Sequence, residues 1–309
     1  MALLGCARQR SYCHDVVHEV WAVGDAYEAY VGRWSRRVAE AFLEWLDVPA
    51  GRHWLDVGCG TGALTTTVLA MADPAQIIGV DTSEGFLANA RARIGDIRST
   101  FCAGDARSLP LANRRFDAIV SGLALNFVPD PRRAAAEFAR VATTGGVAAA
   151  YVWDYAEGMA MMRYFWDAAA TLDPAAAGLD EGHRFPLCRP EPLSELWADA
   201  GMDQVTVQAI EIPTVFADFD DYWRPFLGGQ GSGTRVRHVP DRRKPSCPPR
   251  PAACPPALRP RRVFPAHRKG LGGTRHSEGC ATTLRLGAVA RAPVGQQRRR
   301  ADELSLLAV

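Results

Sequence analysis

The 309-residue sequence lacks the features that mark secreted, zinc-stapled and membrane-spanning proteins. Its eight cysteines include no CxxC pair and no paired metal-ligand spacing, which favours reduced thiols in the cytoplasm. No apolar stretch is long enough to cross a bilayer. The start MALLGC is similar to a lipoprotein cleavage site, but no charged segment or useful apolar run precedes Cys6. We therefore expect a cytoplasmic protein with no membrane span.

The sequence also has little net charge, but this balance conceals an uneven distribution. The whole chain has 36 Lys and Arg and 34 Asp and Glu. After residue 231 there are 17 basic and 4 acidic residues, so the first 231 residues contain 19 basic and 30 acidic ones. Residues 232–309 contain no Trp or Tyr and only one Phe, Phe264. Such a segment buries too little apolar surface to offset its ordering entropy. We expect a flexible N-terminus (1–20), a folded domain (21–231) and a disordered basic tail (232–309).

Three interpretations of the tail are open. It could be a basic arm for nucleic acid or anionic membrane, although it lacks aromatic residues for stacking and any amphipathic periodicity. It could be a disordered extension without function. We favour a third interpretation, a reading-frame shift near Gly231. The first 231 residues use Arg and no Lys, as a GC-rich gene would, and out-of-frame codons of such a gene yield Arg, Pro, Ala, Cys and Gly.

The most informative stretch is WLDVGCGTGALT, residues 54–65. Its apolar start suits a buried strand, and Gly58, Gly60 and Gly62 allow a tight turn that brings backbone close to a ligand. A helix opening near Thr61 would present unpaired N–H groups to that ligand. The spacing fits a dinucleotide site, but Asp56 would repel a pyrophosphate. The carboxylate suits S-adenosylmethionine, which carries an ammonium and a sulfonium.

Two further strand ends carry acids. Gln76–Val80 form a short apolar strand that ends in Asp81, about twenty residues after the glycine turn, where a carboxylate can bind ribose hydroxyls. A third strand, Thr100–Ala103, leads to Asp105, which could accept a hydrogen bond from the amine of adenine. Further strands are expected at Phe116–Val120, Val147–Val152 and Val205–Ile212. Helices are expected at Ser35–Leu46, after the cap residues Ser83 and Asp130, at Pro192–Gly201 and at Asp218–Leu227; Gly145-Gly146 would end the helix that begins at Asp130-Pro131.

With these pieces in one order, the chain resembles the class I S-adenosylmethionine-dependent methyltransferases, in particular the ubiquinone/menaquinone-biosynthesis-like group that acts on small molecules. The resemblance covers about residues 21–227. Its most specific pieces are LDVGCGTG, Asp81, GDARSLP and FARVATTGG, in which Thr144 stands where many relatives have a proline. The resemblance implies a Rossmann-like, doubly wound, mostly parallel α/β sheet. It also implies methyl transfer to a small-molecule acceptor by in-line displacement.

The resemblance also implies which residues bind S-adenosyl-L-methionine. The methionine portion would be surrounded by Asp56, Gly58, Gly60 and Thr61, the ribose would meet Asp81 with Thr82 beside it, the adenine would meet Asp105 and Ala106, and Ser121–Leu123 would lie under the sulfonium, with Leu123 in the site. Upstream, Tyr30, Arg33 and Trp34 could close over the cofactor; alternatively, these aromatics pack the first helix onto the sheet. No catalytic residue is identified, although His183, Asp154 and Glu181 are the nearest candidate bases by chain position.

Several alternatives stay open. A nicotinamide-dependent oxidoreductase would keep the glycine turn and Asp81, and a non-catalytic cofactor-binding protein would keep the whole site. The Met- and aromatic-rich segment 158–187 could line an acceptor pocket or pack a core. After the fourth strand the chain has SGLA where enzymes that methylate adenine amines in nucleic acid usually have NPPY, which disfavours a nucleic-acid substrate. The oligomeric state is undetermined.

One expected element of this fold is absent from the first 231 residues. The family inserts a seventh, antiparallel strand between the fifth and sixth. In the tail only Ala281–Ala290 has strand-like content, and Gly287 weakens it. We therefore expect the final antiparallel strand to be missing or replaced by the basic tail, which would leave an exposed sheet edge.

Overall fold

The structure, a computed structural model, describes residues 33–227 and 280–293. In these ranges helices and strands alternate, as expected of an α/β protein. The elements are α2 (Arg33–Leu46), β1 (His53–Val57), α3 (Ala63–Met71), β2 (Gln76–Asp81), α4 (Glu84–Arg93), β3 (Ser99–Ala103), β4 (Phe116–Gly122), the 3-10 turn η2 (Leu125–Phe127), α5 (Pro131–Val141), β5 (Ala142–Trp153), α6 (Ala160–Leu172), η3 (Pro174–Leu179), α7 (Glu181–Arg184), η4 (Pro186–Cys188), α8 (Pro190–Asp199), β6 (Thr206–Phe216), α9 (Phe219–Leu227) and β7 (Cys280–Pro293).

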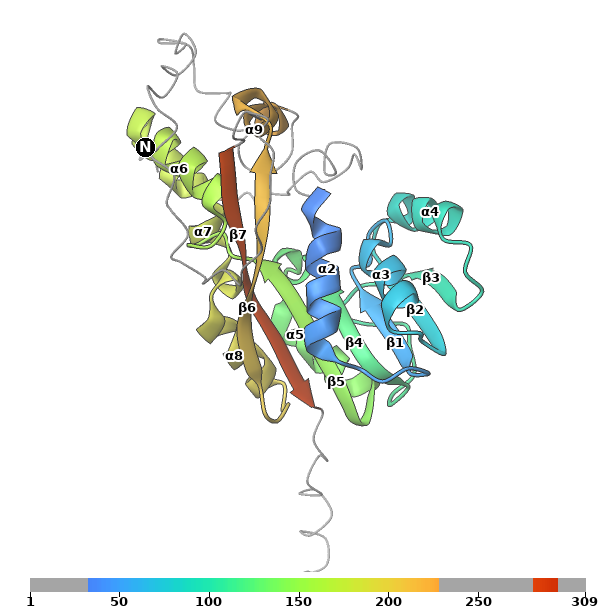
Figure 1. Cartoon of the computed structure of the whole chain (residues 1–309). Helices are drawn as coiled ribbons and strands as arrows, with labels where there is room; N and C mark the ends of the chain where they lie inside the picture. The colour runs from blue at the N-terminus through green and yellow to red at the C-terminus, as the bar shows by residue number, and fades with distance from the viewer. Residues whose placement is uncertain (1–32, 228–279, 294–309) are drawn as a thin grey trace, which may run out of the picture.

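The strands form one seven-stranded sheet in the order β3-β2-β1-β4-β5-β7-β6 (Figure 1). Strands β1 to β5 run parallel to one another. The chain winds outward from β1 to β3, then returns to β4 on the other side of β1. This reversal opens a crevice at the carboxyl ends of β1 and β4, the place where open α/β sheets bind ligands. The prediction of a Rossmann-like, doubly wound, mostly parallel sheet is confirmed.

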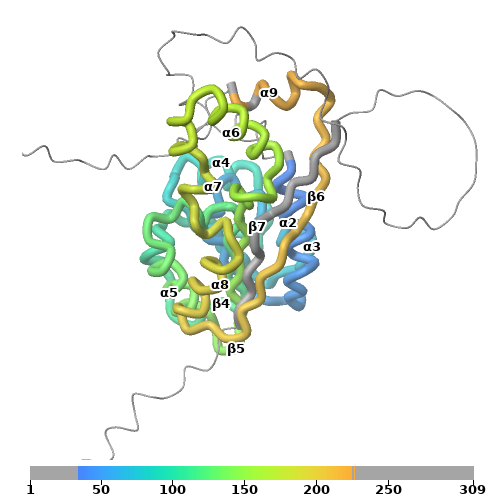
Figure 2. The backbone as a smooth tube through the Cα atoms, turned by 90° about the vertical axis from the view of Figure 1, so that its left-hand side faces the viewer, coloured from blue at the N-terminus to red at the C-terminus, as the bar shows by residue number. Residues whose placement is uncertain are grey.

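Helices cover both faces of the sheet (Figure 2), with α2 and α3 on one side and α5 and α8 on the other. Because neighbouring side chains of a strand point to opposite faces, each strand contributes to two hydrophobic clusters. Trp54 of β1 packs with α2 and α3, whereas Leu55 packs with α5 and α8. Strand β5 is buried along most of its length, as expected for a strand in the middle of a covered sheet.

Local sequence signals set most helix boundaries. The Ser83 hydroxyl accepts a hydrogen bond from the Phe86 amide at 3.3 Å and caps α4. The Asp130 carboxylate accepts one from the Arg133 amide at 3.1 Å and caps α5. The expectation that Gly145-Gly146 end this helix is wrong, because α5 ends at Val141 and the glycines lie inside β5. There they accompany a register irregularity between β4 and β5.

Strand β7 corrects the expectation that the final antiparallel strand is missing. Its backbone pairs antiparallel with both β5 and β6, and Ala290 lies opposite Ala150 on one side and Val207 on the other. The pairing shifts register near Gly287, so the glycine is accommodated by an irregularity in the ladder. The expectations for residues 1–20, and for the parts of the tail before 280 and after 293, lie outside the described residues.

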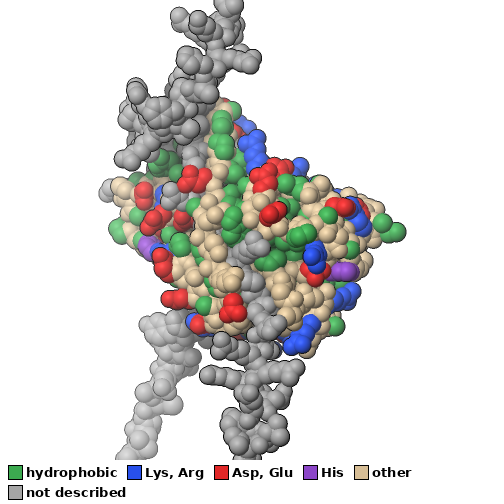
Figure 3. All heavy atoms as spheres, turned by 60° about the horizontal axis from the view of Figure 1, so that its bottom comes forward, with side chains coloured by type: hydrophobic (Ala, Val, Ile, Leu, Met, Phe, Trp, Pro, Cys, Tyr) green, Lys and Arg blue, Asp and Glu red, His purple; other side chains and the backbone are tan. Residues whose placement is uncertain are grey.

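The described surface carries charges of both signs. Figure 3 turns the lower end of Figure 1 forward, and acidic and basic side chains both occur on this face. Among the described helices, none is both long and apolar enough to cross a bilayer. In the same ranges, no group of three His, Cys, Asp or Glu side chains is arranged to hold a metal ion.

Candidate functional site

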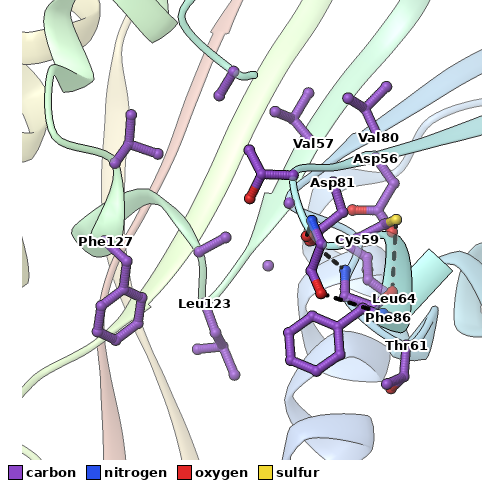
Figure 4. A pocket seen from close by; sticks show the side chains of 18 of the residues that line it. Asp56, Val57, Cys59, Thr61, Leu64, Val80, Asp81, Phe86, Leu123 and Phe127 are labelled. Atoms are coloured by element: carbon purple, nitrogen blue, oxygen red, sulfur yellow. Dashed lines mark hydrogen bonds between the residues drawn. The ribbon is translucent and has the colours of Figure 1, made fainter. Parts of the chain in front are cut away.

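A cavity of about 570 Å³ lies at the carboxyl ends of β1, β2, β4 and β5, where the strand order reverses. In Figure 4, Asp56 and Asp81 lie on one side of this cavity, and Leu123 and Phe127 lie on the other. The charged lining residues come from the β1, β2 and β3 side, including α4, whereas the β4 and β5 side contributes mainly apolar and aromatic ones. The two sides therefore suit different chemical groups.

The glycine turn after β1 requires glycine for two separate reasons. Gly58, Gly60 and Gly62 have φ values of 75°, 54° and 87°, in the left-handed region that other residues rarely adopt. A Cβ on Gly58 would also lie 2.4 Å from the Cβ of Ala124. The amides of Gly58 and Cys59 donate to the Val80 carbonyl at 2.7 and 3.1 Å, which fixes the turn against β2. Gly60 and Thr61 line the cavity at the start of α3.

Asp56, at the end of β1, is completely buried and lines the cavity. Its Oδ2 accepts a hydrogen bond from the Thr65 hydroxyl of α3 at 2.7 Å, whereas its Oδ1 has no hydrogen-bond partner. Burial, with a smaller contribution from the negative charge of Asp81, raises the pKa of Asp56 to about 7. A buried carboxylate oxygen with no donor is costly, so this position suits a ligand group that donates hydrogen bonds and carries positive charge.

Asp81, at the end of β2, holds the turn and also faces the cavity. Its Oδ2 accepts from the Gly60 amide at 2.9 Å, and its Oδ1 accepts from the Ser83 amide at 2.8 Å. A carboxylate has about four acceptor positions, so two are available to a ligand. Thr82 lines the cavity next to it.

Asp105 follows β3 and lines the cavity together with Ala106. Its carboxylate already accepts hydrogen bonds from Arg107. The Arg107 guanidinium donates to both carboxylate oxygens, at 3.0 and 2.6 Å, and the Arg107 amide donates to Oδ1 at 2.8 Å. These hydrogen bonds lower the pKa of Asp105 below its usual range. Asp105, which we expected to accept a hydrogen bond from adenine, thus already accepts hydrogen bonds from Arg107, and Arg107 also lines the cavity.

The opposite wall is apolar and is held in an unusual backbone conformation. Leu123, just after β4, has φ of 60°, and its amide donates to the Tyr151 carbonyl at 2.9 Å. A leucine in this region is strained, and such residues concentrate at functional sites. Phe127 lies further along this wall and packs edge-to-face on Phe185, with 5.2 Å between ring centroids. Tyr155 packs on the same Phe185 ring at 5.7 Å.

Some sequence-predicted residues are not in this cavity. Tyr30 lies outside the described residues, and Arg33 starts α2 but its side chain is outside them as well. Trp34 is buried against Phe216, with 5.2 Å between ring centroids, so it packs the helix onto the sheet and does not line the cavity. The neighbouring Ser35 lines the cavity instead.

The three candidate bases are also elsewhere. Asp154 accepts the Glu157 amide at 2.8 Å in a turn, Glu181 is buried against the indole N–H of Trp166 at 2.5 Å, and the side chain of His183 is 67% exposed. None lines the cavity. Chain position was therefore a poor guide to the base, because α6 and η3 separate Glu181 and His183 from the site. In α6 the side chains of Met161, Met162, Phe165 and Trp166 pack the core, which favours the packing interpretation of segment 158–187 for that helix.

Sequence reasoning also missed lining residues that reach the cavity from helices and turns. Phe86 of α4 is only half-buried and faces the cavity (Figure 4). Its place three residues after the Ser83 cap, beside Asp81, was the available signal. For the others no comparable signal exists in one sequence. The missed residues are Phe86, Asn89, Arg93, Arg107, Phe127 and Val128.

Comparisons with known proteins agree with this geometry. The family model described as "Methyltransferase domain" matches residues 55–150. The demethylmenaquinone methyltransferase of Paenarthrobacter aurescens (strain TC1) is 37% identical over 134 residues, which are 43% of this chain and 47% of that protein. The malonyl-[acyl-carrier protein] O-methyltransferase of Hahella chejuensis (strain KCTC 2396) is 36% identical over 125 residues, 40% of this chain and 44% of that protein. The chain thus spans about half the length of these curated relatives.

A solved structure supports the fold over a longer range. The structure of a protein from Bacillus halodurans C-125, assigned as a methyltransferase, superposes with a TM-score of 0.52 at 14% identity, covering 84% of this chain and 99% of that one. At this identity the likeness concerns the fold alone. Residues 55–150 are thus similar to a methyltransferase domain, and the strand-end acids around the glycine turn agree with the similarity of this chain to class I S-adenosylmethionine-dependent methyltransferases of the ubiquinone/menaquinone type.

Proposed function

We propose that this protein binds S-adenosylmethionine and transfers its methyl group to a small-molecule acceptor. One observation carries the proposal: Asp56, which lines the cavity at the glycine turn, has a buried carboxylate oxygen, Oδ1, without a hydrogen-bond donor. An ammonium supplies both the charge and the donors that this oxygen lacks. A pyrophosphate, as in a nicotinamide dinucleotide, would instead bring negative charge toward Asp56 and Asp81.

The remaining contacts follow from the same geometry. The two acceptor positions left on Asp81 fit the ribose hydroxyls, and Thr82 lies beside them. Asp105 and Ala106 would lie at the adenine, with Arg107 fixing the carboxylate. Gly58, Gly60 and Thr61 would surround the methionine portion, and Leu123 would lie below the sulfonium. Tyr30 and Arg33 remain proposed as residues that close the site.

The bound cofactor supplies a methyl group already activated by the positive sulfur. The protein must then align the acceptor atom, the methyl carbon and the sulfur, and such positioning can lower a barrier by roughly 7–11 kcal/mol. Leu123, Phe127, Trp153 and Tyr155 form the wall on which an acceptor would lie. Among the described residues of this wall there is no carboxylate or histidine, so the wall selects and orients an apolar acceptor.

The relatives suggest which acceptors to try. The proteins from Paenarthrobacter aurescens and Hahella chejuensis are named for demethylmenaquinone and malonyl-[acyl-carrier protein]. We propose a small apolar acceptor for this chain, since its wall is apolar and aromatic. The described cysteines, Cys59, Cys102 and Cys188, are free thiols, which supports the proposal that the protein acts in the cytoplasm.

Binding tests the proposal before any acceptor is known. In calorimetry on the full chain, S-adenosylhomocysteine should bind, and NADH should not. Asp81→Ala should weaken S-adenosylhomocysteine at least tenfold, because it removes two ribose contacts and loosens Gly60. The matched control Asp203→Ala removes an exposed carboxylate away from the cavity and should leave the affinity unchanged. Binding of NADH in preference to S-adenosylhomocysteine would replace the proposal with the oxidoreductase alternative.

Catalysis needs a second assay, because a binding protein without activity would give the same calorimetry. Transfer of a labelled methyl group to a panel of quinols, phenols, amines and acyl thioesters should identify at least one acceptor. Binding of S-adenosylhomocysteine without turnover on any of them would favour the non-catalytic alternative.

A further inference from the structure

Asp56 combines three properties that rarely occur together in one carboxylate. The residue is completely buried, it lines the ligand cavity, and one of its oxygens has no hydrogen-bond partner. The Thr65 hydroxyl, 2.7 Å from the other oxygen, and the Thr65 backbone amide stabilise the charged form. A buried carboxylate in these surroundings is easier to keep neutral than charged.

Among the polar groups packed around Asp56, the carboxylate of Asp81 reinforces this tendency. Strand β2 contributes the carboxylate of Asp81, whose negative charge opposes a second negative charge at Asp56. The glycine turn contributes the thiol of Cys59, which burial and the two aspartates hold neutral by raising its pKa. Helix α3 contributes the Thr65 hydroxyl. Among the described residues, no Arg, Lys or His stabilises the ionised form of Asp56.

We propose that Asp56 is partly protonated in the ligand-free protein at neutral pH and that the α-ammonium of the cofactor displaces its proton into solvent on binding. The inference rests on the proposed function, since it assigns the ammonium of that cofactor to Asp56. The proton balance is simple: the carboxylic acid becomes a carboxylate paired with the ammonium, and the released proton goes to the buffer. Ligand binding at this site is therefore linked to pH.

The expected size of the effect follows from the titration of Asp56. With a pKa of about 7 in the ligand-free protein, about half a proton is released per ligand at pH 7, falling to about a tenth at pH 8. Affinity should rise about tenfold between pH 6 and pH 8, because the ligand no longer competes with the proton. The paired carboxylate stays ionised in the complex over this range.

Calorimetry in buffers of different ionisation enthalpy measures this proton directly. S-Adenosylhomocysteine carries the α-ammonium without the sulfonium, and 5′-methylthioadenosine carries the same nucleoside without the ammonium. The first should release about half a proton at pH 7 and the second should release none. A proton released equally by both ligands would place the titrating group at the nucleoside, and release of none by either would show that Asp56 is already ionised; each result overturns the inference.

Two variants assign the proton to Asp56. Thr65→Val removes the hydroxyl that favours the charged form, so proton release by S-adenosylhomocysteine at pH 7 should increase toward one. Asp56→Asn should abolish the release, with folding checked by circular dichroism. Unchanged release in folded Asp56→Asn would also overturn the inference. The proposed function fails separately, if wild-type protein binds no S-adenosylhomocysteine at any pH.

Discussion

The same buried carboxylate predicts that Asp56→Asn gains stability relative to wild-type ligand-free protein as the pH rises from about 5 to 8. The unfolded chain loses this proton near pH 3.8, whereas the folded protein retains it until about pH 7. Stability therefore falls as pH rises from about 4 to 7, because the unfolded state gives up the proton first. Asp56→Asn cannot ionise, so it removes that loss and keeps an oxygen that can accept from Thr65.

The size of the effect comes from the difference between the two pKa values. Above pH 7 the shift of about 3 pKa units lowers the free energy of unfolding of the wild-type protein by about 4 kcal/mol. Roughly 1.5 kcal/mol of this loss is already present at pH 5. The buried amide introduces N–H groups without partners, at about 1–3 kcal/mol, but this penalty does not vary with pH. Between pH 5 and pH 8 the stability of the variant relative to wild type should rise by about 3 kcal/mol.

Urea unfolding followed by tryptophan fluorescence measures both proteins at each pH. The full chain contains eight tryptophans, of which Trp54 is buried next to Asp56 on β1. Asp203→Asn, an exposed change, is the matched control and should show no such pH dependence. A constant difference between Asp56→Asn and wild type from pH 5 to pH 8 would refute the reasoning, because it would mean that Asp56 titrates alike in the folded and unfolded chains.

Three other predictions concern the turn, the acceptor wall and β7. Gly60→Ala should cost about 1–2 kcal/mol from its positive φ alone. Gly58→Ala should destabilise the protein more, because an added Cβ at Gly58 would also lie 2.4 Å from the Cβ of Ala124; urea unfolding compares the two variants. Phe127→Ala should slow methyl transfer at least tenfold but change S-adenosylhomocysteine affinity less than twofold, and an equal loss in both would contradict its place on the acceptor wall. Ala290→Pro should cost more than about 2 kcal/mol, because Ala290 pairs with both β5 and β6; unchanged stability would contradict the pairing of β7.

The sequence predicted that the three strand-end acids lie together because parallel strands bring their carboxyl ends to one edge. Asp56, Asp81 and Asp105 follow three strands, so the sheet alone brings them to the same cavity. The caps Ser83 and Asp130 were predictable for a similar reason, since a capping side chain acts within three residues of its own position.

The errors concern features decided by distant parts of the chain. Gly145-Gly146 has the composition of a helix C-cap, but pairing with β4 draws these residues into a strand. The β7 segment looks weak by local propensity, yet two neighbouring strands supply its hydrogen bonds. Glu181 and His183 are close in sequence to the end of β5, but the path of α6 decides where they lie. Such placements depend on contacts that a single sequence does not reveal.

The position of β7 has a consequence for how the molecule is made. This strand follows β6 in the chain but lies between β5 and β6, more than 120 residues after the end of β5. While the protein is being synthesised, β1 to β5 can assemble early, but the two flanking strands wait with unpaired edges until their shared neighbour leaves the ribosome. Completion of the sheet is thus a late event in folding, and this is the interval in which the nascent chain most needs protection by a chaperone.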